Sequence, residues 1–145
     1  MKKNLVAYCG LYCGACSFKV AYEVNNNKHL MNMPTKFDEY KNMPLQSCPG
    51  CKSDNECGDC QIKSCAESKE LEHCGLCKEF PCEIIINFNN DGIPHHGESL
   101  ENLKQLKSIG IEQWVKQQDE KWTCNCGEKL SWYFKKCDLC QLLDK

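Results

Sequence analysis

Eight cysteines within 35 residues constrain the fold of this chain more than any other feature. They lie between positions 48 and 82, where the pattern C-x2-C-x4-C occurs twice in succession. The stretch has few aliphatic side chains and many Gly, Pro, Asp and Lys residues, so it buries too little apolar surface to offset the entropy lost on ordering. The C-x2-C spacing lets two thiolates from one tight turn bind the same ion. We therefore predict that metal ions organise this stretch. Its cysteines are Cys48, Cys51, Cys57, Cys60, Cys65, Cys74, Cys77 and Cys82.

Seven further cysteines flank this stretch and bring the total to 15 in 145 residues. Three form a C-x3-C-x2-C motif near the N-terminus, at Cys9, Cys13 and Cys16. The other four form two close pairs on either side of an alternating apolar and polar segment, which predicts a small β-hairpin of the zinc-ribbon type. The first of these pairs has the spacing C-x-C, tighter than the usual C-x2-C. These four are Cys124, Cys126, Cys137 and Cys140.

The start of the chain predicts that these thiols stay reduced. Its apolar run is interrupted by Tyr8, Cys9 and Gly10 before it reaches the length of a signal peptide. No run of the sequence approaches the length of a membrane span. We therefore expect a cytoplasmic protein, in which cysteines at such spacings are more often metal ligands than disulfides. The odd number of cysteines also disfavours a secreted disulfide framework.

The remaining segments predict short helices. Apolar side chains recur at helical intervals, and Gly110 is positioned to cap the end of one helix. Helices are predicted over residues 17–32, 36–42, 62–71, 81–89, 99–109 and 111–118.

The predicted fold class is a small α+β protein: an irregular, metal-stapled, cysteine-rich domain with short helices, followed by a C-terminal zinc-ribbon β-hairpin. We predict two domains. Residues 1–119 form the cysteine-rich metal-binding domain with a helical C-terminal part, and residues 120–145 form the zinc-ribbon module.

These cysteine motifs together resemble a bacterial and archaeal family of small cysteine-rich proteins whose domain is of unknown function. Members open with C-G-L-x-C-x-x-C, matched here at 9–16, and continue with C-x-G-C, matched at 48–51. They then show C-x2-C-x-I-x-x-C, matched at 57–65, and C-x2-C-x2-F-P-C, matched at 74–82. The resemblance implies a cytoplasmic protein that binds metal, with zinc as the expected ion, and it implies no particular activity.

The partition of ligands among ions stays open. Eleven cysteines precede residue 90, and three arrangements fit them: two four-thiolate sites with spare thiols, three sites with a twelfth ligand, or a cluster with a bridging thiolate. The twelfth ligand could be His73, His29 or a water. Closed tetrahedral zinc sites are structural, whereas an open position can activate water or bind substrate. We interpret the sites as closed, with two or three Zn²⁺ ions in the N-terminal domain and one in the ribbon.

Three other interpretations of the cysteines rank below zinc. An Fe–S cluster of the ferredoxin type favours C-x2-C-x2-C-x3-C-P, but here Pro81 precedes Cys82 instead of following it. The spacing of the first three cysteines also occurs in radical-SAM enzymes, and C-x2-C pairs occur in thioredoxin-like dithiols. Both need alternating strands and helices, which the sequence after Cys16 does not show.

The sequence favours a structural zinc protein that acts as a binding or adaptor module, with an unknown partner. It shows no Ser/His/Asp order, phosphate loop or supported carboxylate pair, so an enzymatic role stays open and we lean against it. One alternative is a metalloenzyme with an open zinc site or an Fe–S cluster. In the favoured interpretation of a structural zinc protein, His95 and His96 are solvated loop residues, with a metal or catalytic role as the alternative, and the tryptophans at 114, 122 and 132 are packing residues.

The second alternative is a nucleic-acid-associated zinc ribbon, with Trp132, Tyr133 and Phe134 as stacking residues. The charges disfavour it. All basic residues are lysines, so the arginine fork that reads guanine and clamps phosphate is missing. Residues 120–145 carry a net charge of +1, which falls to about −1 when four thiolates bind Zn²⁺.

Overall fold

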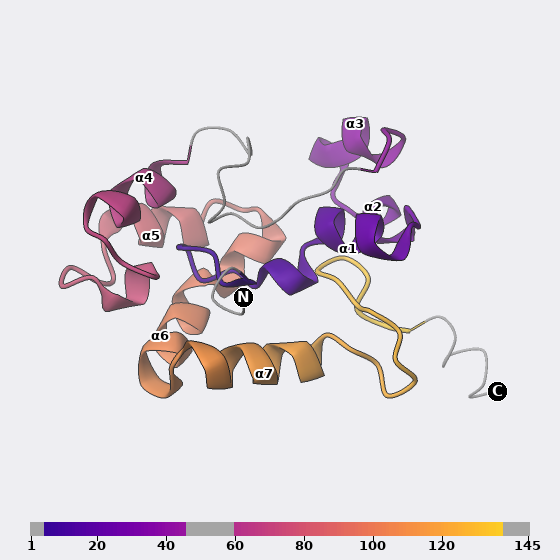
Figure 1. Cartoon of the computed structure of the whole chain (residues 1–145). Helices are drawn as coiled ribbons and strands as arrows, with labels where there is room; N and C mark the ends of the chain where they lie inside the picture. The colour runs from indigo at the N-terminus through magenta and orange to yellow at the C-terminus, as the bar shows by residue number, and fades with distance from the viewer. Residues whose placement is uncertain (1–4, 46–59, 138–145) are drawn as a thin grey trace. The chain divides into compact units, whose positions relative to one another are not determined.

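The computed structural model describes residues 5–45 and 60–137, and within these ranges the chain is mainly helical (Figure 1). None of the helices in these ranges combines the length and the apolar character that a membrane span requires. The α-helices are α1 (Ser17–Val24), α2 (Lys28–Met31), α3 (Asp38–Lys41), α4 (Gln61–Ser68), α5 (Glu83–Asn89), α6 (Ser99–Ile109) and α7 (Ile111–Lys121). Short 3-10 turns are η2 (Cys13–Ala15), η3 (Thr35–Phe37), η4 (Cys74–Leu76) and η5 (Pro94–Glu98).

The apolar periodicity located these helices better than it located their ends. Helix α6 has the predicted bounds, and Gly110 caps it with φ +85° as expected. Helix α5 ends as predicted but begins at Glu83, two residues after the predicted start at Pro81. The predicted helix over 17–32 is instead divided into α1 and α2. Asn25 adopts a left-handed conformation with φ 53°, and its N–H donates to the Tyr22 carbonyl oxygen at 3.1 Å. This arrangement is a common way to end a helix, so the apolar pattern continues through a helix boundary.

The predicted α+β fold class with a zinc-ribbon hairpin is wrong. In the described residues the β-structure is limited to isolated bridges, such as Thr123 with Lys129 and Ser131 with Phe134. Ser131 and Phe134 exchange two backbone hydrogen bonds of 3.0 Å across a tight turn, and no ladder continues from them. The Trp132 N–H donates to the Ala15 carbonyl oxygen at 3.0 Å, so this segment finds a backbone partner far away in sequence.

The chain divides into two compact units. The first unit contains Met1–Cys13 and Pro49–Lys116, and the second contains Gly14–Cys48 and Gln117–Lys145. Each unit therefore combines an N-terminal segment with a segment from later in the chain. The domain boundary predicted between residues 119 and 120 stays a prediction.

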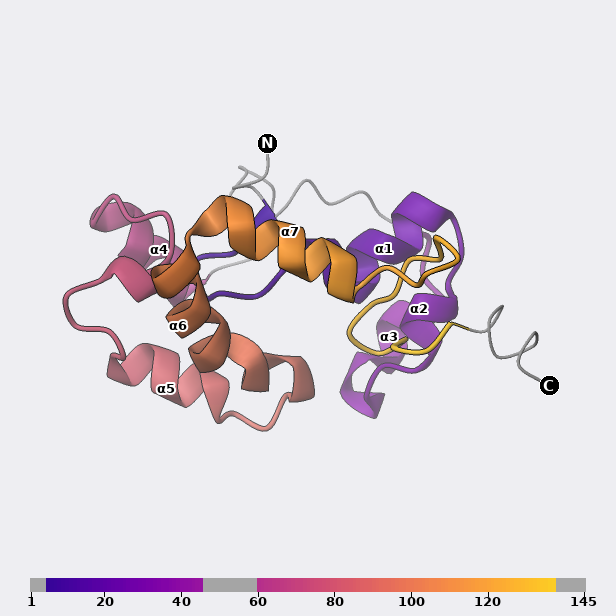
Figure 2. The same cartoon turned by 90° about the horizontal axis from the view of Figure 1, so that it is seen from below.

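Helix α6 carries the core of the first unit. Its side chains Leu103 and Leu106 are fully buried, as is Ile85 of α5, and the two helices lie beside each other (Figure 2). Trp114 of α7 has 0% exposure, and its ring meets the ring of Tyr12 edge-on at 5.9 Å. Buried residues of the cysteine motifs, among them Ile62 and Cys74, also belong to the core of this unit.

Hydrogen bonds hold the N-terminal cysteine loop in place within the first unit. The Ser99 hydroxyl donates to the Cys9 carbonyl oxygen at 2.6 Å, and the Asn102 amide donates to the Gly10 carbonyl oxygen at 3.0 Å. The Cys74 N–H donates to the Tyr8 carbonyl oxygen at 2.9 Å. The loop therefore contacts both α6 and the turn that carries a central cysteine of the array.

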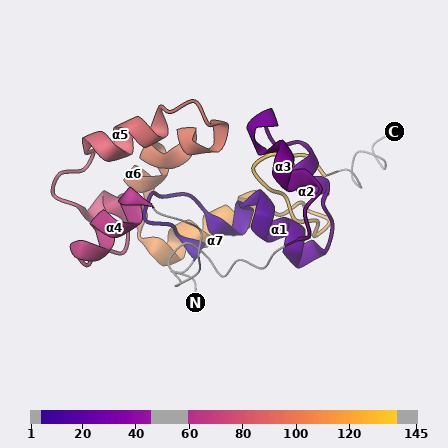
Figure 3. The same cartoon turned by 90° about the horizontal axis from the view of Figure 1, so that it is seen from above.

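In the second unit, helices α1, α2 and α3 lie close to the C-terminal segment (Figure 3). Ala21, Leu30 and Met33 form a buried apolar cluster. Tyr133 of the C-terminal segment packs against this cluster, and so does Phe18 of α1. Burial of these side chains fixes the C-terminal segment on the helices of its own unit.

Candidate metal centre

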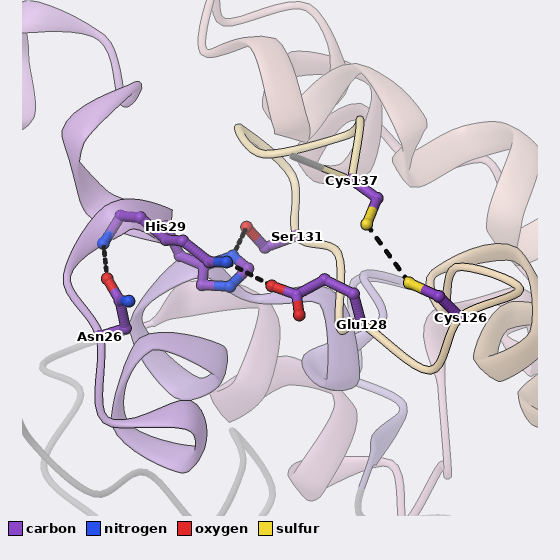
Figure 4. A network of polar contacts seen from close by, with 7 residues as sticks. Asn26, His29, Cys126, Glu128, Ser131 and Cys137 are labelled. Atoms are coloured by element: carbon purple, nitrogen blue, oxygen red, sulfur yellow. Dashed lines mark hydrogen bonds and ion pairs between the residues drawn. The ribbon is translucent and has the colours of Figure 1, made fainter. Parts of the chain in front are cut away.

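Three cysteine sulfurs converge in the C-terminal segment of the second unit. The Sγ atoms of Cys124, Cys126 and Cys137, here called the C-terminal cysteine cluster, all lie within 4.8 Å of one another. The sulfurs of Cys126 and Cys137 are 3.4 Å apart (Figure 4). Four sulfurs bound at about 2.3 Å around one tetrahedral Zn²⁺ lie roughly 3.8 Å from each other. The observed spacing therefore suits a thiolate-bound ion. Within 5–45 and 60–137, no other three His, Cys, Asp or Glu side chains meet the same spacing.

A tight turn brings the first two cysteines of the cluster together. The Gly127 N–H donates to the Cys124 carbonyl oxygen at 2.8 Å, and the Cys124 N–H donates to the Glu128 carbonyl oxygen at 2.8 Å. Gly127 has φ +93°, a conformation that residues with a side chain rarely adopt. This turn accommodates the C-x-C spacing, which is shorter than the two-residue gap of an ordinary zinc knuckle.

Polar contacts fasten the same segment to α1 and α2 (Figure 4). Lys28 forms an ion pair with Glu128, and both side chains are partly buried. The Ser131 hydroxyl lies 2.7 Å from Nδ1 of His29 and 3.3 Å from the Ser17 hydroxyl. These contacts involve none of the sulfurs, so the segment is held by its own unit independently of an ion.

A second group of thiols lies in the first unit, and we call it the first-unit thiols: Cys60, Cys65, Cys74, Cys77 and Cys82. Burial first, and then the charges of the other four thiols with Cys82 foremost, raise the pKa of the Cys74 thiol to about 12. Five sulfurs therefore share one electrostatic neighbourhood around Cys74. This neighbourhood combines thiols from both C-x2-C-x4-C repeats.

A lysine lies next to one of the first-unit thiols. The Lys69 ammonium donates to the Cys77 sulfur at 3.4 Å and to the Glu79 carboxylate at 3.2 Å. The Glu79 contact and then the Cys77 contact raise the pKa of Lys69 above its ordinary value. A positive charge at this position offsets part of the negative charge that several thiolates would bring together.

Comparison with known proteins is informative for the first two-thirds of the chain. A family model described as "Protein of unknown function (DUF3795)" matches residues 5–87, more than half of the sequence. The chain belongs to this family. The predicted resemblance to a family of unknown function is thereby confirmed. No curated protein and no solved structure matches the chain.

The DUF3795 match contains the eleven cysteines from Cys9 to Cys82, whereas the C-terminal cysteine cluster lies beyond it. The opening family motif is shared between the units: Cys9 and Cys13 belong to the first, and Cys16 precedes α1 in the second. The assignment of all fifteen cysteines as ligands stays a prediction. Four of them lie outside the described residues: Cys48, Cys51, Cys57 and Cys140.

The two histidines considered as a twelfth ligand are both buried and engaged. Nδ1 of His73 accepts a hydrogen bond from the Gly75 N–H at 3.1 Å, which caps η4 in front of Cys74. The ring of His29 contacts Ser131 through Nδ1 and meets the Phe134 ring edge-on at 4.8 Å. By accepting the Gly75 N–H, His73 fixes the backbone of the turn that carries the candidate ligand Cys74.

The loop histidines are more ordered than the sequence indicates. Nδ1 of His96 lies 2.7 Å from the Asp91 carboxylate, and its ring stacks on Phe88 at 3.9 Å. The His95 ring packs edge-on against His96 at 4.5 Å. These contacts close the turn between α5 and α6.

The side chains proposed for base stacking are engaged in packing. Trp132 has 9% exposure, Tyr133 packs on the apolar cluster of the second unit, and Phe134 contacts His29. Sequence analysis missed the pairing of His29 with Ser131. The two residues lie far apart in sequence, and each is a common residue without a motif around it.

Proposed function

We propose that this protein is a zinc-binding module in which the metal mainly stabilises the fold and the protein acts by binding a partner. The observation that carries the proposal is the convergence of Cys124, Cys126 and Cys137 within 4.8 Å. Thiolate donors at tetrahedral spacing favour Zn²⁺, which accepts sulfur ligands without a redox change. The sequence offers Cys140 as the fourth ligand of this site.

The first-unit thiols support a second metal site. Five thiols grouped around Cys74 would repel each other as thiolates, and bound cations remove this repulsion. Their number exceeds the four ligands of one tetrahedral ion. We therefore expect at least one ion in the first unit in addition to one at the C-terminal cysteine cluster.

A structural role for the metal is supported by what surrounds the C-terminal cysteine cluster. The contact between Ser131 and His29 has the residue types of a hydrolase pair, but both side chains have 0% exposure. A substrate cannot reach them without unfolding the segment. Their buried hydrogen bond is therefore best interpreted as a packing contact.

A binding role is supported by exposed large side chains of the second unit. Tyr22, Met31, Tyr40 and Met43 are 40% to 50% exposed. Tyrosine and methionine are enriched where proteins contact each other.

The test is metal analysis of the purified protein by native mass spectrometry under reducing conditions. We expect zinc, a colourless protein, and loss of one ion from the Cys126→Ser and Cys137→Ser variants. Asn125→Ser is the matched control, because Asn125 lies between two cysteines of the cluster and supplies no sulfur. We expect it to keep the full metal content.

Two results would contradict the proposal. One is a protein without bound ions whose cysteines are joined in disulfides. The other is a brown protein with the absorbance of an Fe–S cluster, because sulfur-bound iron absorbs near roughly 400 nm and Zn²⁺ does not.

A further inference from the structure

The three sulfurs of the C-terminal cysteine cluster differ in their access to solvent. Cys126 is exposed, Cys124 is half-buried and Cys137 is buried with 6% exposure. The exposed sulfur and the buried sulfur lie 3.4 Å apart. A reagent from solvent therefore meets Cys126 first, and Cys137 is already next to it.

We propose that the C-terminal cysteine cluster is a peroxide-responsive thiol switch, in which Cys126 is oxidised first and Cys137 then closes a disulfide that releases the bound ion. This inference rests on the proposed function, because it requires an ion at this cluster. It adds that a hydroperoxide regulates that site. Hydroperoxides are oxidants that react with exposed thiolates.

The chemistry balances with hydrogen peroxide as the oxidant. The Cys126 thiolate attacks one peroxide oxygen, so an S–O bond forms, the O–O bond breaks and hydroxide leaves. Cys126 is then a sulfenic acid. The Cys137 thiolate attacks the Cys126 sulfur, so the S–S bond forms, the S–O bond breaks and a second hydroxide leaves. The two thiolates lose two electrons in total, and the two hydroxides take up protons to become water.

The second step requires little movement. A disulfide has an S–S distance of about 2.05 Å, so the two sulfurs must approach by roughly 1.4 Å. Cys126 lies in the exposed turn closed by Gly127, where no β-ladder opposes such a shift. Joining the two sulfurs removes two of the thiolate ligands, and an ion cannot stay bound with the same affinity.

The rest of the second unit is expected to survive this change. The contacts of Lys28 with Glu128 and of His29 with Ser131 involve no sulfur. Oxidation therefore changes the metal-binding turn while the segment after it stays anchored to α1 and α2.

The first-unit thiols provide an internal comparison. Their central member Cys74 is buried with 8% exposure, and the Lys69 ammonium lies beside Cys77. Cys60 is exposed like Cys126, but no contact between its sulfur and a second sulfur is seen at a comparable distance in the described residues. We expect the first-unit thiols to react after Cys126.

The experiment treats the zinc-loaded, reduced full-length protein with a limiting amount of hydrogen peroxide in two parallel reactions, one with dimedone to trap sulfenic acids and one without it. A zinc-sensitive dye follows the release of the ion, and tryptic peptides are mapped by mass spectrometry. Cleavage after lysine places Cys126 in the peptide 122–129 and Cys137 in the peptide 137–145. With dimedone, we expect the first adduct on Cys126. Without dimedone, we expect a link between these two peptides and the loss of one ion in step with the link. Each peptide holds a second cysteine, Cys124 or Cys140, so fragmentation of the peptides assigns the sulfurs.

Two variants separate the roles of the sulfurs. In Cys137→Ser, the dimedone adduct on Cys126 should accumulate, because the thiol that resolves it is missing. In Cys124→Ser, the link between Cys126 and Cys137 should still form. These readouts follow sulfur chemistry directly, so they hold even where a variant binds zinc weakly.

Three results would overturn the switch. They are a first adduct on Cys60, a link that uses Cys124 in place of Cys126, and zinc release without any link between the two peptides when dimedone is absent. Each of these would leave the proposed zinc function standing. Absence of zinc from the untreated protein would instead remove the proposed function itself.

Discussion

Replacing Gly10 by alanine tests how the opening cysteine motif is held on the first unit. Gly10 has φ +87°, and a Cβ added there would lie 2.7 Å from Cγ of Leu103 and 3.1 Å from the carbonyl oxygen of Ser99. Leu103 has 0% exposure and cannot move without disturbing the core around α6. The substitution therefore combines an unfavourable backbone conformation with overpacking.

The two contributions can be estimated separately. A left-handed conformation costs alanine roughly 1–2 kcal/mol. Overpacking of a buried side chain costs about 1–3 kcal/mol. We expect the Gly10→Ala substitution to lower the free energy of unfolding by about 2–5 kcal/mol, a large part of the roughly 5–15 kcal/mol that stabilises a typical domain.

Two other glycines provide matched controls. Gly110 has φ +85° and ψ 164° with open space where a Cβ would lie, so Gly110→Ala should show only the backbone cost of roughly 1–3 kcal/mol. Gly97 has neither a positive φ nor a close neighbour, and Gly97→Ala should change stability by no more than about 0.5 kcal/mol. The expected order of destabilisation is Gly10, then Gly110, then Gly97.

The assay is urea unfolding of the zinc-loaded proteins at one fixed concentration of free zinc, followed by far-UV circular dichroism. Hydrogen exchange adds a local readout, because α6 should lose amide protection in Gly10→Ala and keep it in Gly97→Ala. Equal destabilisation in the Gly10 and Gly110 variants would refute the reasoning, since the contact of the loop with Leu103 and Ser99 would then contribute nothing.

Three further predictions concern pH, anchoring and metal. Burial and then the charge of Glu67 raise the pKa of Tyr8. Above about pH 10 the folded protein thus keeps a proton that the unfolded chain loses, so the free energy of unfolding should fall as pH rises. This pH dependence should weaken in Tyr8→Phe. Lys28→Met removes the ion pair with Glu128 and a cation–π contact with Phe134. Native mass spectrometry should show zinc leaving the C-terminal cysteine cluster about fivefold faster, as expected for a loss of roughly 1 kcal/mol. Lys19→Met should leave the rate of zinc loss unchanged. Removal of zinc with a chelator should unfold the first 90 residues, because ion binding there supplies folding free energy; cooperative melting of the stripped protein would contradict this.

The helices were predictable where the signal is local. The apolar spacing of Leu103 and Leu106 is enough to indicate α6, because a helix places such residues on one face wherever the chain lies. Asn25 shows the limit of that signal, since a single residue with a left-handed backbone divides the predicted helix while the apolar pattern continues.

The prediction of a zinc-ribbon hairpin was wrong for a different reason. Alternation of apolar and polar side chains around Leu130 and Trp132 predicts a strand, but a strand also needs a backbone partner. Here Trp132 bonds to Ala15 and Leu130 bonds to Trp122, so neither partner is the expected second strand of a hairpin. A local pattern contains no information about which distant residue supplies the hydrogen bond.

The sequence by itself determined that the protein is rich in closely spaced thiols, that it belongs to a family of unknown function, and that Cys124 and Cys126 lie together. A spacing of one or two residues keeps two sulfurs close whatever the rest of the chain does. Only the tertiary structure decided which separate pairs meet, because that depends on how helices pack. The burial of α5 and α6 accompanies the grouping of thiols around Cys74, and the contacts of Ser131 with α1 and α2 fasten the segment in which Cys137 meets Cys126.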